Sequence, residues 1–344
     1  MLYLKFQSIA NKIFSMQNRT EQFLNDPVFP LLIRMSAPNT IAFFIQAIVV
    51  LAEVWFISKL GTTSLAAVAL AFPIIMLTQQ MAFGALGGAV SSSIARSLGA
   101  EDKERAEKLL WHSLLLSCCG YLLFFLVFFI GGESLLMALG GEGSLLEESL
   151  LYIKIFLTGA IFIWLSGTLS AALRGIGNMR FPALLMIAGS GIQVILAGGL
   201  ILGWFGLPKL GIIGAPLSAI SVAAFMAIVM IFKFMHSSSN VQLKISNLSF
   251  EKELFRDIFN VALPASLAPI FTVGTILILT GLVGQFGVSA LAGYGIGSRI
   301  EFLMIPLVFG IGTAMTTMVG TNIGANKVER AERIGWLGGS FAGL

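Results

Sequence analysis

Long apolar stretches alternate with short polar segments along the 344-residue chain. Crossing the roughly 30 Å hydrocarbon core of a bilayer takes about 20 apolar residues in a helix. Because lipid offers no hydrogen-bond partners, such spans must satisfy their own backbone groups and are helices. A partial ninth span begins near Ile334. The eight full stretches lie at residues 31–58, 64–92, 109–131, 151–173, 182–206, 211–235, 260–284 and 289–320. The pattern predicts an all-α, polytopic membrane protein with about eight and a half transmembrane helices.

The chain also repeats itself. Residues 99–108 read GAEDKERAEK and residues 324–333 read GANKVERAER, an offset of 225. Further upstream, GTTSLA at 61–66 pairs with GVSALA at 287–292, at an offset of 226. A repeat of this length indicates a duplicated domain. We therefore divide the chain into an N-terminal segment, a first lobe of six spans, a linker and a partial second lobe, at residues 1–28, 29–236, 237–257 and 258–344.

Composition and charge support a membrane protein and predict its orientation. Hydrophobic residues make up 57% of the chain and charged residues 11%, against about 25% charged in soluble domains. Lys and Arg collect on the side of the amino terminus, whereas the other side has only Lys59, Lys154 and Lys209. Short cytoplasmic loops are enriched in these residues. We expect a cytoplasmic N-terminus in a cell membrane, two lobes inserted in parallel, and no nucleic-acid partner.

The amino-terminal segment and the linker also fit this arrangement. The first 28 residues place Phe6, Ile9, Ile13 and Met16 at helical spacing beside basic residues. This pattern is typical of a helix in the cytoplasmic interface, although a frayed terminus explains it equally well. The linker contains Ser237-Ser-Ser-Asn240.

Nothing in the sequence indicates an enzyme, a cofactor or a metal site. Cys118 and Cys119 are adjacent within a span, and the chain has only two histidines, His112 and His236. This set does not have metal-ligand spacing. No nucleophile with a nearby base and no Walker loop is present.

Polar residues within the spans are costly and so are usually functional. In the first span Asn39, Gln46 and Glu53 are spaced seven apart, which keeps them on one helix face because the drift is only about 20° per step. Glu53 is the one acidic residue in the first six spans. It either couples transport to an ion, or it reaches the outer surface or pairs with Lys59.

Four further polar residues are candidates. Gln79 in the second span and Gln193 in the fifth either join helices or line a cleft. Arg299 and Glu301 lie in the eighth span, roughly 200° apart around the helix, so they do not face each other. Each is either half of an interhelical ion pair or part of a transport site.

An ordered set of motifs resembles the multidrug and toxic compound extrusion (MATE) family of antiporters. It consists of Pro38, Leu60-Gly61, the repeated loop at 99–106, Arg174-Gly-Ile-Gly-Asn178 and the loop at 319–331. The resemblance implies two bundles of six helices around a central cleft. It also implies alternating-access export of cationic, often aromatic drugs in exchange for protons or sodium ions. The wider superfamily includes lipid-linked oligosaccharide flippases.

The sequence departs from that family at the expected ion sites. Glu53 stands where the family typically has Asp, and Gln193 and Ala197 stand where many members have Asn and Asp. No acidic residue occurs from Pro264 to Thr280, where another branch has Glu. The ion-coupling candidates are therefore Glu53 and Glu301, and the cleft-lining candidates are Asn39, Gln46, Gln79, Gln193 and Arg299.

Three functions remain open. The favoured one is a secondary active multidrug exporter of small, often cationic or amphipathic molecules, with the bilayer as its environment and no obligate protein partner. A lipid or lipid-linked saccharide flippase is the second, and Arg299 is its one basic candidate. The third is an inactive, C-terminally truncated product, since the resemblance implies twelve spans.

Overall fold

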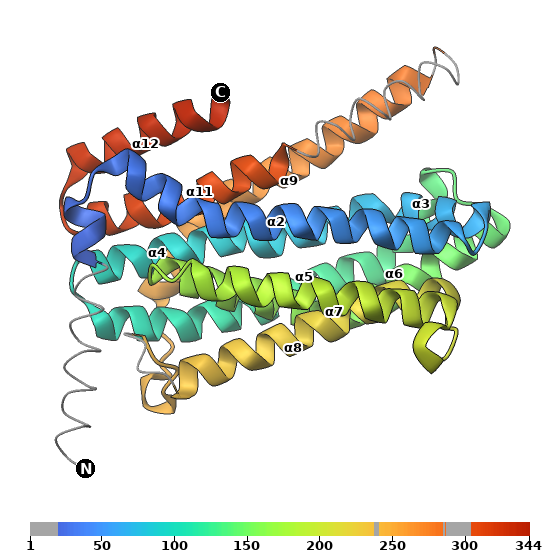
Figure 1. Cartoon of the computed structure of the whole chain (residues 1–344), viewed down its shortest axis with the longest axis horizontal. Coiled ribbons are helices and arrows are strands. Elements are labelled where there is room, and N and C mark those ends of the chain that lie inside the picture. The colour runs from blue at the N-terminus through green and yellow to red at the C-terminus, as the bar shows by residue number, and fades with distance from the viewer. Residues whose placement is uncertain (1–19, 237–240, 285, 287–303) are drawn as a thin grey trace.

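A computed structural model of the chain describes residues 20–236, 241–284, 286 and 304–344, and Figure 1 shows its arrangement. The helices of the first copy are α2 (Val28–Ser58), α3 (Thr62–Gln79), α4 (Gly87–Gly99), α5 (Lys103–Ala138), α6 (Gly143–Gly175), α7 (Arg180–Leu202) and α8 (Gly214–His236). Those described in the second copy are α9 (Lys252–Gly284), α11 (Ile305–Gly324) and α12 (Val328–Gly343). The short helical turns are η1 (Gln80–Leu86), η2 (Trp204–Gly206), η3 (Gly211–Ile213) and η4 (Ile245–Asn247).

The predicted fold class is confirmed. Within the described ranges, eight helices are long and apolar enough to cross a membrane. One of them is continuous from Thr62 to Gly99, because the π-helical turn η1 joins α3 to α4. Helix α9 begins at Lys252, so residues 252–257 of the predicted linker are helical. Arg299, Glu301 and residues 1–19 lie outside the described residues.

The first copy packs around α6, which contacts α3, α4, α5 and α8. Its side chains Ile153, Phe156 and Leu169 are almost completely buried. Helix α5 lies at the outside, and its Ile130 is 79% exposed. Leu123, Val127 and Phe129 of the same helix are exposed as well. Exposed apolar side chains along a helix long enough to span a bilayer form a surface for lipid.

The repeated sequence forms the same loop twice. Glu101 and Asn326, which are 225 residues apart, both have positive φ angles, of 61° and 57°. The backbone N–H of Asp102 donates to Ser97 at 2.9 Å, and that of Lys327 donates to Asn322 at 2.8 Å. These bonds satisfy carbonyl groups that the helix ends would otherwise leave unpaired. Local sequence therefore determines this turn in both copies.

The two copies meet where α4 crosses α11, next to these loops. A Cβ atom on Gly99 would collide with the carbonyl oxygen of Thr321, and one on Gly324 would collide with that of Arg96. The contact is reciprocal, because Thr321 is the counterpart of Arg96 just as Gly324 is the counterpart of Gly99. Small residues at such positions let membrane helices approach closely. The crossing therefore depends on the duplicated glycine.

The start of the first copy also packs on the end of the second. Residues 20–25 are helical, and Phe23 and Leu32 form a buried cluster with Ala314, Met318 and Ile334. Figure 1 shows α12 and the described segment that leads into α2 together at one end of the molecule, while α9 runs obliquely away toward the other end.

We expect Gly324→Ala to destabilise the protein, because the new methyl group meets backbone atoms that cannot move aside cheaply. Overpacking of this kind costs about 1–3 kcal/mol. Gly312→Ala is the matched control in the same helix, since a Cβ atom there has no neighbour within 4 Å. It should be neutral or stabilising by a few tenths of a kcal/mol. Thermal unfolding of the detergent-solubilised chain measures both, and equal melting temperatures would contradict the proposed importance of the crossing.

Candidate functional site

A chain of polar side chains surrounds Glu53 between α2, α7 and α8. Gln193 Nε2 donates to Glu53 Oε1 at 2.9 Å, and Ser218 Oγ donates to the same oxygen at 3.4 Å. Gln46 Nε2 donates to Gln193 Oε1 at 3.3 Å, and Ser190 Oγ donates to Gln46 Oε1 at 2.9 Å. The structure thus places three candidates, Gln46, Glu53 and Gln193, in one cluster inside the first copy.

Glu53 has no ion pair with any side chain of the described ranges. Lys59, considered from the sequence as its partner, instead places Nζ 5.0 Å from the centre of the Trp55 ring. An acidic group inside a membrane helix without a cationic partner is costly. Carboxylate, amide and hydroxyl oxygens are also the ligands that hard cations prefer. The cluster is chemically suited to take up a proton or a sodium ion.

Asn39 shares the α2 face with Glu53 but lies in a different environment. Fourteen residues of helix separate the two by about 21 Å. The Asn39 side chain is 2% exposed, and its Nδ2 donates to Thr313 Oγ1 of α11 at 3.3 Å and contacts the sulfur of Met179 at 3.4 Å. Asn39 therefore joins the two copies, whereas Glu53 stays within the first.

A cavity of about 400 Å³ lies between the copies. Its wall combines η1, α4 and the end of α6 with α9 and α11. Gln80 lines it, whereas the sequence candidate Gln79 is exposed outside its lining; successive residues of a helix point about 100° apart. The residues that line it are Gln80, Phe83, Gly84, Ala85, Gly87, Gly88, Ser91, Arg174, Ala265, Ala268, Pro269, Val308, Phe309, Gly312, Thr313 and Thr316.

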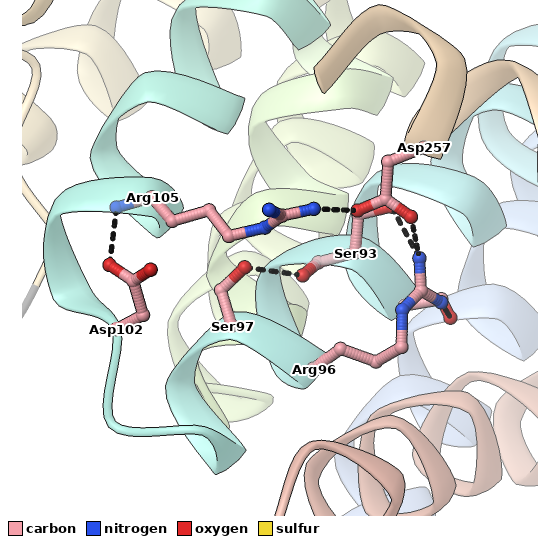
Figure 2. Close-up of polar contacts among 7 residues, drawn as sticks. Ser93, Arg96, Ser97, Asp102, Arg105 and Asp257 are labelled. Carbon is pink, nitrogen blue, oxygen red and sulfur yellow. Dashed lines mark hydrogen bonds and ion pairs between the residues drawn. The ribbon is translucent and has the colours of Figure 1, made fainter. Parts of the chain in front are cut away.

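At the end of the molecule where the repeated loops lie, an ion-pair cluster ties the second copy to the first. Asp257, near the start of α9, accepts from Arg96 Nη2 of α4 at 2.6 Å and from Arg105 Nη2 of α5 at 3.1 Å. Figure 2 shows the two arginines approaching the carboxylate from different helices, and Asp102 capping the backbone N–H of Arg105. Charge-assisted hydrogen bonds are the stronger kind, so this cluster holds α9 against the first copy.

The second loop makes the reciprocal contact. Arg330, the counterpart of Arg105, donates to the carbonyl oxygens of Phe23 and Asp26, just before α2. Lys327 donates to the carbonyl oxygen of Leu24 at 3.2 Å. Each copy therefore uses the same arginine of its repeated loop to hold the start of the other copy's first long helix. We call these two sets of contacts the crossed latches.

The segment before α9 is docked on α5 as well. Lys108 Nζ lies 3.0 Å from a carboxylate oxygen of Glu251, and the backbone N–H of Glu251 donates to His112 Nε2 at 3.0 Å. The hydrogen bond from Lys108 lowers the pKa of Glu251 below its ordinary value. Glu107 accepts from Asn247 Nδ2 at 2.5 Å. Polar contacts therefore fix the entry to α9 at the same end of the molecule.

Sequence reasoning missed several of these residues. Ser190 and Ser218 complete the Glu53 cluster, but serine is common in apolar helices and gave no signal. Asp257 ends the linker, where the sequence predicts a short amphipathic helix leading into the seventh span but no partner for this carboxylate. Arg174 was noted only as part of a motif. The repeated Glu-Arg-Ala of the two loops was the available signal for the crossed latches, because a duplicated charged motif indicates a duplicated contact.

Comparison with known proteins gives consistent matches. The family model described as MatE matches residues 38–197 and 264–338. A FAD transporter of Shewanella oneidensis is 26% identical over 320 residues, which cover 90% of this chain and 68% of that protein. The multidrug export protein MepA of Staphylococcus aureus is 27% identical over 307 residues, covering 89% and 67%. The chain thus spans about two thirds of the length of these relatives.

A solved structure described as the outward-facing conformation of a multidrug resistance MATE family transporter matches with a TM-score of 0.82. The two are 29% identical, and the match covers 91% of this chain and 69% of the other. Sequence and fold therefore agree over the same region.

We expect Asp257→Asn to loosen the latch at the start of α9, because it leaves Arg96 and Arg105 without their carboxylate. Nitroxide labels at Lys103→Cys and Val328→Cys, which are counterparts in the two loops, report the distance between the loops. Cys118 and Cys119 are replaced by serine so that only these two positions are labelled. Pulsed electron paramagnetic resonance should show a longer and broader distance distribution. Glu253→Gln removes the same charge from an exposed position of α9 and should leave the distribution unchanged. Identical distributions for both variants would rule out this role for Asp257.

Proposed function

The chain belongs to the MatE family, whose members are transporters rather than enzymes, and we propose that it is a secondary active exporter of small organic molecules. Export would proceed in exchange for protons or sodium ions, by alternating access. No cofactor other than the coupling ion is proposed.

The names of the relatives support export of small molecules. MepA is described as a multidrug export protein, and the Shewanella relative is described as a FAD transporter. The first relative supports drug-like substrates and the second a nucleotide-containing one. We therefore propose efflux of small organic compounds as the activity. The groups that line the cavity determine which substrate charge is accepted.

The observation that carries the proposal is the arrangement of the cavity between the copies. It lies between elements of both copies, and the crossed latches join the copies at the end where the repeated loops lie. A cavity of about 400 Å³ is within the usual range for small-molecule sites. Release of the latches at one end and closure at the other would give access from alternate sides, as in transporters built from two repeats.

We propose Glu53 as the coupling group. Its cluster lies inside the first copy, and Asn39 on the same helix reaches the second copy through Thr313. Uptake of an ion at Glu53 would change the hydrogen bonds of Gln193, Gln46 and Ser218. A change in the packing of α2 against α7 and α8 would then reach the interface between the copies, because α2 also packs on α11.

A lipid-linked saccharide flippase is the second candidate. Recognition of a pyrophosphate-linked headgroup requires several cationic donors, whereas Arg174 is the one charged residue among the described side chains that line the cavity. This observation favours a smaller substrate.

The orientation and surroundings follow from the same proposal. We place the amino terminus and the repeated loops on the cytoplasmic side of the cell membrane, because Lys and Arg are concentrated there. Residues 29–236 would act as one lobe and the residues after the linker as part of the other. Small molecules and lipid are the proposed partners, without an obligate protein partner.

We expect Glu53→Gln to lower export at least tenfold, because the amide cannot exchange a proton or balance a sodium ion. Proteoliposomes with an imposed proton or sodium gradient measure it, using the dyes rhodamine 6G and fluorescein in parallel. Glu133→Gln, at an exposed position of α5, is the matched control and should export at the wild-type rate. Equal export by both variants would exclude Glu53 as the coupling group, and loss of export in every protein, wild type included, would overturn the proposed function.

A further inference from the structure

The geometry points to an aromatic anion as the molecule that the cavity between the copies binds, with the Arg174 guanidinium holding its carboxylate or phosphate group. This inference rests on the proposed function in one respect only, that the bound molecule is cargo.

Arg174 is a buried cation with unused donors. Its side chain is 3% exposed, yet it belongs to the lining of the cavity. Its Nη1 donates to Ser170 Oγ at 2.8 Å, and none of the ion pairs formed by the described residues involves it. A guanidinium has five N–H donors. Most of its hydrogen-bonding capacity is therefore available to a ligand.

The end of its own helix does not supply the missing acceptors. Carbonyl groups in the last turn of a helix can stabilise a cation. Here the carbonyl oxygen of Leu173 accepts from the Asn178 N–H at 2.9 Å, and that of Arg174 accepts from the Gly177 N–H at 2.7 Å and from Thr317 Oγ1 at 3.1 Å. These oxygens are already engaged in the turn and in contact with α11, so the guanidinium lacks a full set of partners.

The neighbouring helix carries glycine where it passes the guanidinium. A Cβ atom on Gly87 would lie 4.0 Å from Arg174 Nη2, and one on Gly88 would meet nothing within 4 Å. Both glycines belong to the lining. A larger residue at Gly87 would cover the cation, so the small residues leave a path from the cavity to Nη2.

The rest of the described lining does not offset this charge. Its polar side chains are Gln80, Ser91, Thr313 and Thr316, all of them neutral. The hydroxyl groups of Thr313 and Thr316 donate to carbonyl oxygens of their own helix, at 2.9 and 2.8 Å. In a poorly solvated site a single unpaired charge dominates recognition. The lining therefore favours an anion over a cation of the same shape.

The aromatic part of the substrate follows from the apolar lining. Phe83 from η1 and Phe309 from α11 belong to the two copies and both line the cavity. A Cβ atom on Gly84 would lie 3.7 Å from the Phe309 ring, so no side chain stands between the ring and the π-helical turn. Flat apolar surfaces of this kind suit a planar ring system. Arg174 would then bind the acidic group of that molecule in a bidentate manner.

Two dyes with the same ring system and opposite charge test the inference by binding. Fluorescein is an anion and rhodamine 6G is a cation, and both contain the xanthene ring. Fluorescence anisotropy with the purified full chain in detergent, corrected against empty micelles, should give at least tenfold tighter binding of fluorescein. Tighter binding of rhodamine 6G to the unaltered protein would overturn the inference without any variant.

Variants assign the effect to Arg174. Arg174→Gln should weaken fluorescein binding at least tenfold and leave rhodamine 6G binding unchanged or tighter, and Arg174→Lys should give an intermediate loss because the point charge remains. Arg180→Gln removes the same charge from an exposed position outside this cavity and should bind both dyes as the wild type does. Unchanged fluorescein binding in a folded Arg174→Gln protein would show that Arg174 is structural only.

The test separates this inference from the proposed function. If fluorescein binds through Arg174 but neither dye is exported, the anion site stands and the transport proposal fails. If rhodamine 6G is exported and Arg174→Gln does not change fluorescein binding, the transport proposal stands and the anion site fails. Displacement of bound fluorescein by benzoate, but not by benzylammonium, provides a second measurement on the unaltered chain should the variants not fold.

Discussion

The close approach of α4 and α11 at Gly99 and Gly324 is the contact on which the arrangement of the two copies depends. Backbone meets backbone there, because each glycine faces the carbonyl oxygen of the residue three positions before the other. In a membrane, where apolar burial provides little net attraction between helices, such backbone packing and interhelical hydrogen bonds are the main sources of association. The Ser91 and Thr317 hydroxyl groups, 3.1 Å apart, add such a bond on the same pair of helices. The crossed latches lie next to this crossing and reinforce it.

The structure places two kinds of polar chemistry in separate regions. The Glu53 cluster is enclosed by α2, α7 and α8 of the first copy. Arg174 lines the cavity between the copies. The Glu53 carboxylate and the Arg174 guanidinium form no ion pair with each other or with any other described side chain. Helix α2 connects the two regions, since it contains Glu53 and packs through Asn39 against α11. The proposed coupling between Glu53 and the cavity would therefore run through this one helix.

Symmetry explains the scaffold but not the candidate sites. The repeated loop, the glycine at its start and its arginine have the same backbone conformation and the same kind of role in both copies. Glu53, by contrast, aligns with Leu279 at the offset of 226, so the acid occurs in one copy only. The two copies therefore share the crossing and its loops, whereas the acid has no counterpart in the second copy.

The sequence by itself determined the number and type of the long helices, the duplication and the one-face spacing of Gln46 and Glu53, because hydrophobic length and helical period are local properties. It also located the loop that bends identically twice. Which polar residues meet was decided by tertiary structure alone: Gln193 joins Glu53, Gln80 rather than Gln79 lines the cavity, Asp257 pairs with Arg96 and Arg105, and Arg174 lacks a carboxylate partner within the described residues. Such pairings depend on the rotation and crossing of helices far apart in the chain, and a small change in either exchanges one neighbour for another.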